Sequence, residues 1–268
     1  MAESLVNTRF AWNPLFRRFP GFCCLNGPAR HAHAHDDIEP TDAALAMSNT
    51  FVIPDIHGRL DLLEEGLAEI GARSNGRGNT IVTIGDYVDK GPSSKGVIER
   101  LRSGVGGFDL VTLKGNHDAM MADALRDHST MADWLRKGGD AALASYGGDP
   151  AQVSQSDIDW LDGLRLLHAD RYRLYVHAGV DPETPLDLQR EETLLWKRYP
   201  KGYSEGFGDL HVVHGHDNDP DGPLLYRGRT NLDTLAWRTG RLTVGVFDDD
   251  APGGPIDFIV VQGAPARR

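Results

Sequence analysis

Short apolar runs alternate with segments of helical periodicity in the first half of this chain. Residues 51–53, 80–84 and 110–113 are continuous apolar runs that predict buried strands. Leucine and isoleucine recur at helical spacing over residues 60–70, and a second helix is expected from about residue 93 to 102. Strands and helices that alternate in this way are typical of a βαβαβ unit with a mostly parallel sheet.

The second half of the chain is richer in strands. Residues 118–165 are expected to be helical. Four further strands are predicted, at residues 172–176, 211–213, 242–247 and 257–261. Residues 1–49 show neither periodicity, so we expect a disordered N-terminal extension followed by one folded α/β domain over residues 50–263.

Side chains that bind metal ions follow several of these strands. Six stand at strand ends, in loops that also contain Gly or Pro: Asp55, His57, Asp86, Asn116, His177 and His216. Ligands of open α/β sheets gather at the carboxyl ends of the strands, so we expect these side chains to converge at one sheet edge. Carboxylate, imidazole and amide groups suit mid-series ions such as Mn²⁺, Fe²⁺ or Zn²⁺.

The number of candidate ligands is typical of a site for two cations. One bridging carboxylate with about three partners on either side suits two ions roughly 3.5–4 Å apart. Such a pair lowers the pKa of a shared water molecule and neutralises charge that develops in an in-line displacement. Hydrolysis of a phosphate ester most needs this help, because the uncatalysed reaction is extremely slow.

Composition narrows the range of partners. The 268 residues include 39 acidic and 28 basic side chains, for a net charge of −11. This balance disfavours nucleic acid, because binding of a phosphate backbone depends on clustered Lys and Arg. No apolar run approaches the length of a membrane span, so no membrane partner is expected. The only cysteines, Cys23 and Cys24, are adjacent and a poor disulfide pair, which favours a reducing, cytoplasmic compartment.

Five ordered motifs resemble those of a known family. They are PDIHG at 54–58, GDYVDKG at 85–91, GNHD at 115–118, VHAG at 176–179 and GH at 215–216. From about residue 50 to 247 the chain is similar to the calcineurin-like metallophosphoesterases, and within them to the phosphoprotein phosphatases in their compact bacterial and phage form. The resemblance implies two mixed β-sheets packed as a sandwich and flanked by helices, with a dinuclear metal site at one sheet edge.

The resemblance also divides the candidate ligands between two divalent cations. Asp86 would bridge them. The first cation would also be held by Asp55 and His57, and the second by Asn116, His177 and His216. Mn²⁺ is the expected metal, with Fe or Zn as alternatives.

Further residues are candidates for the reaction itself. The resemblance implies that His117 is the general acid that protonates the departing alkoxide, polarised by the carboxylate of Asp89. Residues expected to bind the substrate phosphate are Lys90, Asn116, Arg198 and Arg59. A role of Asp89 in the turn alone, and an ordinary surface role for Arg198, remain the alternatives.

Two positions depart from the pattern of the family, and a third helps to place the chain within it. Lys90 stands where the family has Arg, and because lysine lacks the planar fork that grips two oxygens, we expect weaker or less oriented phosphate binding. Pro54 replaces the usual Gly and should stiffen its loop. Asn218 stands where many phosphodiesterases of the superfamily have a second histidine, so the first cation would have fewer protein ligands, as in the phosphoprotein phosphatases. His214 is then expected to support the site or the core.

The expected activity is hydrolysis of phosphoserine or phosphothreonine in proteins by direct attack of a metal-bridging hydroxide. Residues 134–139 (WLRKGG) and 144–147 (ASYG) support it, because they resemble bacterial protein phosphatases of this family. The alternative enzyme is a symmetrical diadenosine tetraphosphate hydrolase or another hydrolase of small phosphoesters, for which a more basic pocket is expected. A catalytically dead module that binds phosphoproteins is the alternative outside enzymes.

Overall fold

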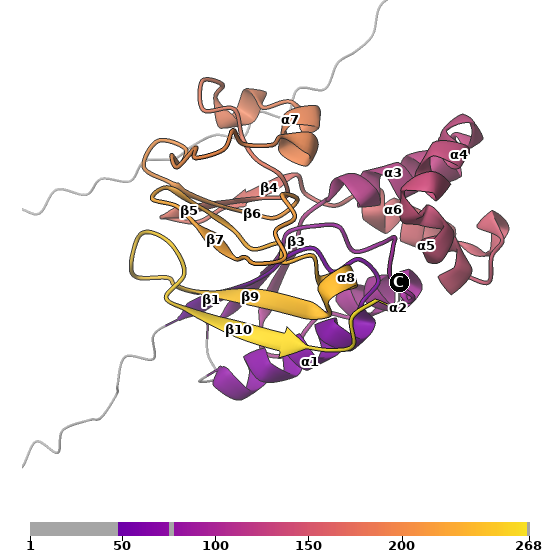
Figure 1. Ribbon diagram of the computed structural model, residues 1–268, viewed down its shortest axis with the longest axis horizontal. Coiled ribbons are helices and arrows are strands. Elements are labelled where there is room, and N and C mark those ends of the chain that lie inside the picture. The colour runs from indigo at the N-terminus through magenta and orange to yellow at the C-terminus, as the bar shows by residue number, and fades with distance from the viewer. Residues whose placement is uncertain (1–47, 75–77, 267–268) are drawn as a thin grey trace, which may run out of the picture. The chain divides into compact units, whose positions relative to one another are not determined.

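Two mixed five-stranded sheets form the centre of the part of the chain that the computed structural model describes, residues 48–74 and 78–266 (Figure 1). The first sheet has the order β10-β9-β1-β2-β3. Its strands are β1 (Asn49–Ile53), β2 (Thr80–Thr83), β3 (Asp109–Thr112), β9 (Arg241–Asp248) and β10 (Asp257–Gln262). β1, β2 and β3 are parallel, whereas β9 and β10 run antiparallel to their neighbours. Phe51 pairs with Ile81 and Ile81 with Leu110, so the three parallel strands end together.

The second sheet has the order β4-β5-β6-β8-β7. Its strands are β4 (Leu167–Ala169), β5 (Arg173–Val176), β6 (His211–His214), β7 (Leu224–Leu225) and β8 (Arg229–Asn231). The central three are parallel, and β4 and β7 are antiparallel edge strands. One buried apolar cluster joins the two sheets: Val52, Val82, Ile84, Leu113, Tyr175, Val213, Leu232 and Phe247. The predicted sandwich of two mixed sheets is therefore confirmed.

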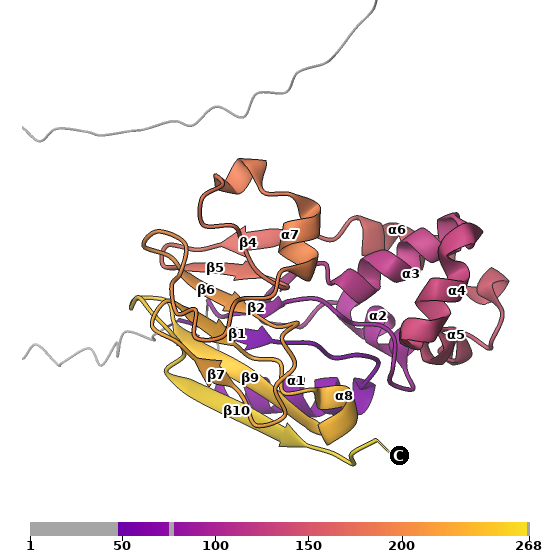
Figure 2. The ribbon, with the colours of Figure 1, turned by 45° about the horizontal axis from the view of Figure 1, so that its top comes forward.

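Helices cover the outer faces of this sandwich. α1 (Leu60–Arg73) lies on β9 and β10, and its apolar residues at helical spacing are the ones it buries. At Gly66 the helix comes close to β9, since a Cβ there would lie 3.6 Å from the side chain of Leu242, an ordinary van der Waals contact. α7 (Glu191–Trp196) covers the second sheet, where Leu194 packs with Val176 and Val212 (Figure 2).

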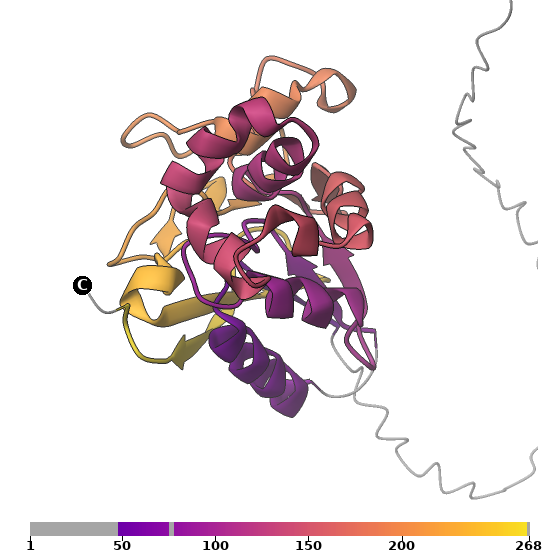
Figure 3. The ribbon, with the colours of Figure 1, turned by 90° about the vertical axis from the view of Figure 1, so that its right-hand side faces the viewer.

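The predicted helical stretch is broken into several short helices. They gather at the end of the sandwich where β1, β2 and β3 finish (Figure 3). They are α3 (Asn116–Arg126), α4 (Met131–Trp134), α5 (Asp140–Ser145) and α6 (Gln155–Asp162), and α2 (Ser94–Arg102), the helix expected at about residues 93–102, lies at the same end. A π-helical turn, Leu135–Gly139, separates α4 from α5, and Gly138 within it has a φ of 111° that ends regular helix geometry. α8 (Ala236–Thr239) precedes β9, and 3₁₀ turns form at His128–Thr130, Pro150–Gln152 and Leu186–Leu188.

The boundaries expected from the sequence agree with the corresponding elements to within three residues. β4, β7, β8, α7 and α8 were not expected. The predicted N-terminal extension falls on residues 1–47, which lie outside the described residues, and Asn49 already belongs to β1. Within residues 48–74 and 78–266, no helix combines the length and apolar character needed to cross a membrane.

Candidate metal centre

Buried donor side chains converge at the carboxyl ends of β1, β2 and β5. Two groups of three have ligand atoms within 4.8 Å of one another and can hold a metal ion: His57, Asp86 and His117, and Asp55, Asp86 and His177. Asp86 belongs to both groups, which is the position expected of a bridging carboxylate. The first group contains His117, which the family resemblance implied to be the general acid and not a metal ligand.

Two histidines, His57 and His177, direct their Nε2 atoms toward Asp86. His57 Nδ1 lies 2.8 Å from the carbonyl oxygen of Val88, and His177 Nδ1 lies 2.9 Å from that of Ile84. Each Nδ1–H therefore donates to the main chain, and each Nε2 keeps its lone pair facing the site. The Nε2 atoms lie 3.2 Å (His57) and 3.5 Å (His177) from the carboxylate oxygens of Asp86. A backbone carbonyl that fixes the outer nitrogen is the usual support of a histidine ligand.

The contact between His177 and Asn116 also indicates a cation. His177 Nε2 lies 2.8 Å from the side-chain oxygen of Asn116. Since Nδ1 carries the hydrogen of this imidazole and burial lowers its pKa, both facing atoms are acceptors. Two lone pairs repel at this distance, and a positive ion that accepts both relieves the repulsion.

Buried carboxylates strengthen the same argument. Burial raises the pKa of Asp55 well above its usual range, and repulsion from Asp233 and Asp86 adds to the shift. Burial likewise raises the pKa of Asp233. Burial also acts to raise the pKa of Asp86, but the imidazoles of His177, His117 and His57 outweigh it and lower that pKa well below its usual range. Carboxylates desolvated together are costly unless a cation is bound among them, so this donor set fits divalent metal ions.

A hydrogen-bonded chain of three side chains adjoins the ligands. His117 Nδ1 lies 2.6 Å from Asp89 Oδ2, and the indole Nε1 of Trp134 donates to both oxygens of Asp89, at 2.9 and 3.1 Å. Burial lowers the pKa of His117 to about 2 and raises the pKa of Asp89, although the bond from Trp134 opposes the latter shift. Both shifts favour the neutral form of each group, and the contact of Nδ1 with Asp89 leaves Nε2 of His117 to face the site.

Asp118 fixes the backbone around Asp86. Its fully buried carboxylate accepts hydrogen bonds from the N–H groups of Asp86 (2.8 Å), Tyr87 (2.9 Å) and Gly115 (2.8 Å). The two loops meet so closely that a Cβ on Gly115 would lie 2.2 Å from the backbone nitrogen of Asp86. The sequence placed Asp118 within a motif but assigned it no role.

Backbone strain is concentrated at the same place. Six non-glycine residues among those the structure describes have a positive φ, and five of them are predicted site residues: His57 (45°), Asp86 (55°), Asp89 (72°), Lys90 (65°) and His216 (64°). Such conformations cost about 1–3 kcal/mol each and persist where the surrounding structure holds them, typically at functional sites.

The predicted phosphate-binding residues differ in their surroundings. Lys90 Nζ lies 2.9 Å from His57 Nε2, at the centre of the site. Arg198 is 59% exposed and donates to Asp217 at 2.8 Å. The guanidinium of Arg59 is buried, bound at two positions by Asp61 (2.7 and 2.8 Å) and by the carbonyl of Ala236. Binding of substrate by these side chains stays a prediction, and for Arg59 it requires that the pair with Asp61 opens.

Residues that follow β6 and β8 complete the surroundings. The ring of His216 lies 5.1 Å from that of His177, and its backbone N–H points at Asp55 Oδ1 at 3.2 Å. His216 is outside the two tight donor groups, so its role as a ligand stays a prediction. His214 is fully buried and bonded to Arg229 (2.9 Å), as expected of a supporting histidine. Asp233, which accepts from Asn218, was missed because no apolar pattern marks the strand before it.

Comparisons with known proteins agree with this geometry. Residues 49–247 match the family model for calcineurin-like phosphoesterases. Serine/threonine-protein phosphatase 1 of Salmonella typhimurium is 35% identical over 158 residues, which are 56% of this chain and 68% of that protein.

Solved structures share the fold. A Saccharomyces cerevisiae protein serine/threonine phosphatase with similarity to human phosphatase PP5 superposes with a TM-score of 0.58 at 13% identity, over 84% of this chain and 83% of that one. A structure described as a candidate diadenosine tetraphosphatase gives a TM-score of 0.55 at 24% identity, over 82% and 96%. At these identities the likeness is one of fold alone.

Proposed function

Because this chain belongs to the calcineurin-like phosphoesterase family, we propose that it hydrolyses phosphoserine and phosphothreonine in proteins, with two divalent cations bound around Asp86. The observation that carries the proposal is the shared place of Asp86 in two buried donor groups. The preference for phosphorylated proteins rests on the 35% identity to a serine/threonine-protein phosphatase.

The cations, when bound, would lower the pKa of a water molecule and neutralise charge on the phosphate. Of the protein's own groups, Asp86 is assigned to both cations. We assign Asp55 and His57 to one, and Asn116, His177 and His216 to the other. Mn²⁺ is the proposed metal.

Other residues would bind the phosphate and move the proton. Lys90 and Arg198 supply positive charge toward the phosphate oxygens, Lys90 from beside His57. When water adds to phosphorus, the bond from phosphorus to the seryl or threonyl oxygen breaks. His117 would donate a proton to that oxygen, and its ring is held in position by Asp89.

Two measurements test the proposal in sequence. Turnover of p-nitrophenyl phosphate with added Mn²⁺, and its loss after EDTA, distinguishes an enzyme from a protein that only binds phosphoproteins. Asp86→Asn should abolish turnover, whereas the matched control Asp123→Asn, an exposed aspartate on α3, should retain it.

Substrate choice is then tested directly. A phosphothreonine peptide and diadenosine tetraphosphate are compared at equal enzyme concentration, and we expect faster hydrolysis of the peptide. Rapid cleavage of the dinucleotide with no turnover of the peptide would reverse the assignment.

A cytoplasmic location is proposed from the cysteine usage alone.

A further inference from the structure

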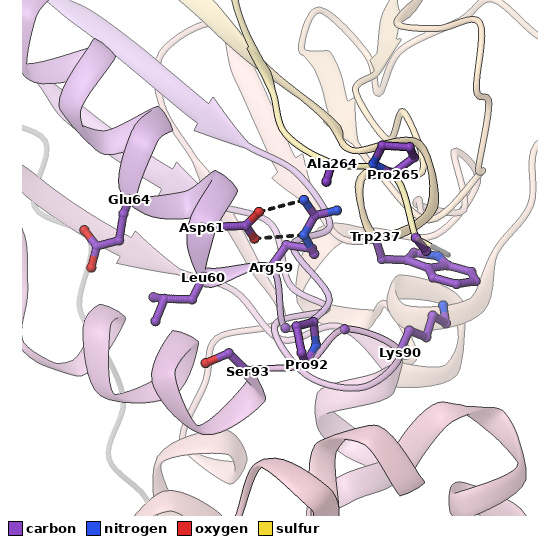
Figure 4. Close-up of a pocket in the computed structure, with 13 residues that line it drawn as sticks. Arg59, Leu60, Asp61, Glu64, Lys90, Pro92, Ser93, Trp237, Ala264 and Pro265 are labelled. Atoms are coloured by element: carbon purple, nitrogen blue, oxygen red, sulfur yellow. Dashed lines mark hydrogen bonds and ion pairs between the residues drawn. The ribbon is translucent and has the colours of Figure 1, made fainter. Parts of the chain in front are cut away.

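A cavity of about 670 Å³ opens beside the candidate metal centre (Figure 4). Lys90 belongs to both, because its Nζ lies 2.9 Å from His57 Nε2 while its side chain lines the cavity. Figure 4 shows the Lys90 amine directed toward the ring of Trp237, and the distance from Nζ to the ring centroid is 5.8 Å. A group bound in the cavity would therefore lie next to a phosphate held at the metal centre.

The wall of the cavity is held in place by the fold. It is formed by the start of α1, the loop at residues 90–93, α8 and residues 264–266. The last segment is fixed by backbone hydrogen bonds from Gly263 N to the Gly240 carbonyl (2.8 Å) and from Ala266 N to the Arg238 carbonyl (3.1 Å). This volume and a wall of apolar side chains with a few polar groups are typical of a ligand pocket.

The polar groups of the wall are mostly neutralised. Arg59 and Asp61 form a bidentate pair, and Glu64 is paired with Arg100 at 3.1 Å. Lys90 forms no ion pair with a carboxylate within the described part of the chain. The indole Nε1 of Trp237 is buried and has no hydrogen-bond partner among the described residues.

These features distinguish between ligand chemistries. A polyphosphate chain would find a single unpaired cation, Lys90, on the described wall of the cavity, because Arg59 is paired with Asp61. A polypeptide brings an apolar side chain for the surfaces of Leu60, Pro92 and Trp237. The wall therefore favours a neutral, partly apolar peptide segment.

We propose that this cavity holds an apolar or aromatic side chain of the substrate polypeptide, close to its phosphorylated residue, and so selects among phosphoproteins. The inference rests on the proposed protein phosphatase activity. Trp237 is its specificity-determining residue, since it supplies the aromatic face beside Lys90.

The test uses the full chain with Mn²⁺ and matched phosphothreonine peptides. Phenylalanine or alanine is placed at each position on either side of the phosphothreonine, and kcat/KM is measured for every pair. At one or two adjacent positions we expect phenylalanine to be preferred about tenfold, as burial of an aromatic side chain implies. Trp237→Ala should remove most of this preference and Trp237→Phe should retain part of it. Trp196→Ala, a change of a tryptophan outside the cavity, should preserve it.

Each other outcome contradicts the inference in a distinguishable way. Hydrolysis of all peptides without a preference would overturn the cavity assignment and leave the phosphatase activity standing. A preference that survives Trp237→Ala would place the selecting surface elsewhere. Turnover of p-nitrophenyl phosphate without turnover of any peptide would overturn the protein phosphatase proposal and this inference together. A KM that rises in Trp237→Ala only for diadenosine tetraphosphate would assign the cavity to a nucleobase.

Discussion

Replacing Trp134 with phenylalanine removes the hydrogen-bond donor to Asp89, the carboxylate that holds the candidate acid His117, while keeping an aromatic ring in the core. Trp134 is 1% exposed, and its Nε1 is the donor that holds both oxygens of Asp89. Asp89 in turn holds His117 at 2.6 Å. Without the indole N–H, the carboxylate is free to rotate and the imidazole loses its fixed orientation.

The expected magnitude follows from the bond that is lost. A hydrogen bond to a carboxylate that is charged in the transition state contributes about 1.5–3 kcal/mol. Because about 1.4 kcal/mol corresponds to a tenfold change in rate, a bond that acts fully in the transition state gives a loss of about 10- to 100-fold. The free energy of unfolding should also fall, since the smaller ring leaves a cavity beside Gly139.

Two substrates separate an effect on the acid from an effect on packing. A phosphothreonine peptide releases an alkoxide, which needs a proton as it departs, whereas p-nitrophenyl phosphate releases a stable phenolate that does not. We expect Trp134→Phe to lower kcat strongly for the peptide and only slightly for the aryl ester. Trp160→Phe is the control, because Trp160 packs against Tyr87 at 5.6 Å. Equal losses for both substrates would refute the reasoning and leave Trp134 a packing residue only.

Three further substitutions test other parts of the account. Asp118→Asn should lower the free energy of unfolding by about 1–3 kcal/mol, because one of its three backbone donors is left unsatisfied; an unchanged midpoint in urea would argue against this. Lys90→Arg should lower KM for p-nitrophenyl phosphate about tenfold by restoring a planar fork, and an equal or higher KM would show that the lysine is matched to this site. Gly71→Ala should raise the free energy of unfolding by about 0.4–1 kcal/mol, since a Cβ there meets nothing within 4 Å, and a lower melting temperature would contradict it.

The sequence predicted the parts of the site that follow apolar strands. Asp55 and Asp86 were found because buried runs end just before them, and parallel strands bring such ends to one edge. The mixed two-sheet architecture came from the family resemblance, since the strand order depends on contacts between distant segments. Nothing in the local pattern indicates that β9 pairs with β1.

The parts of the structure that the sequence did not predict have polar or aromatic side chains, which are compatible with more than one role. β8 is fully buried yet reads Arg-Thr-Asn, because Arg229 stacks on Tyr199 and Tyr226 (4.6 and 3.7 Å to the ring centroids). Asp233 follows this strand and was therefore not expected at the site. Trp134 lies in the core, but its bond to Asp89 depends on a contact between distant segments that periodicity does not reveal.

The most direct test of the central claim is anomalous diffraction from crystals of the protein loaded with Mn²⁺. We expect two anomalous peaks roughly 3.5–4 Å apart, one on either side of the Asp86 carboxylate. A single peak, or two peaks that do not share Asp86, would contradict the account.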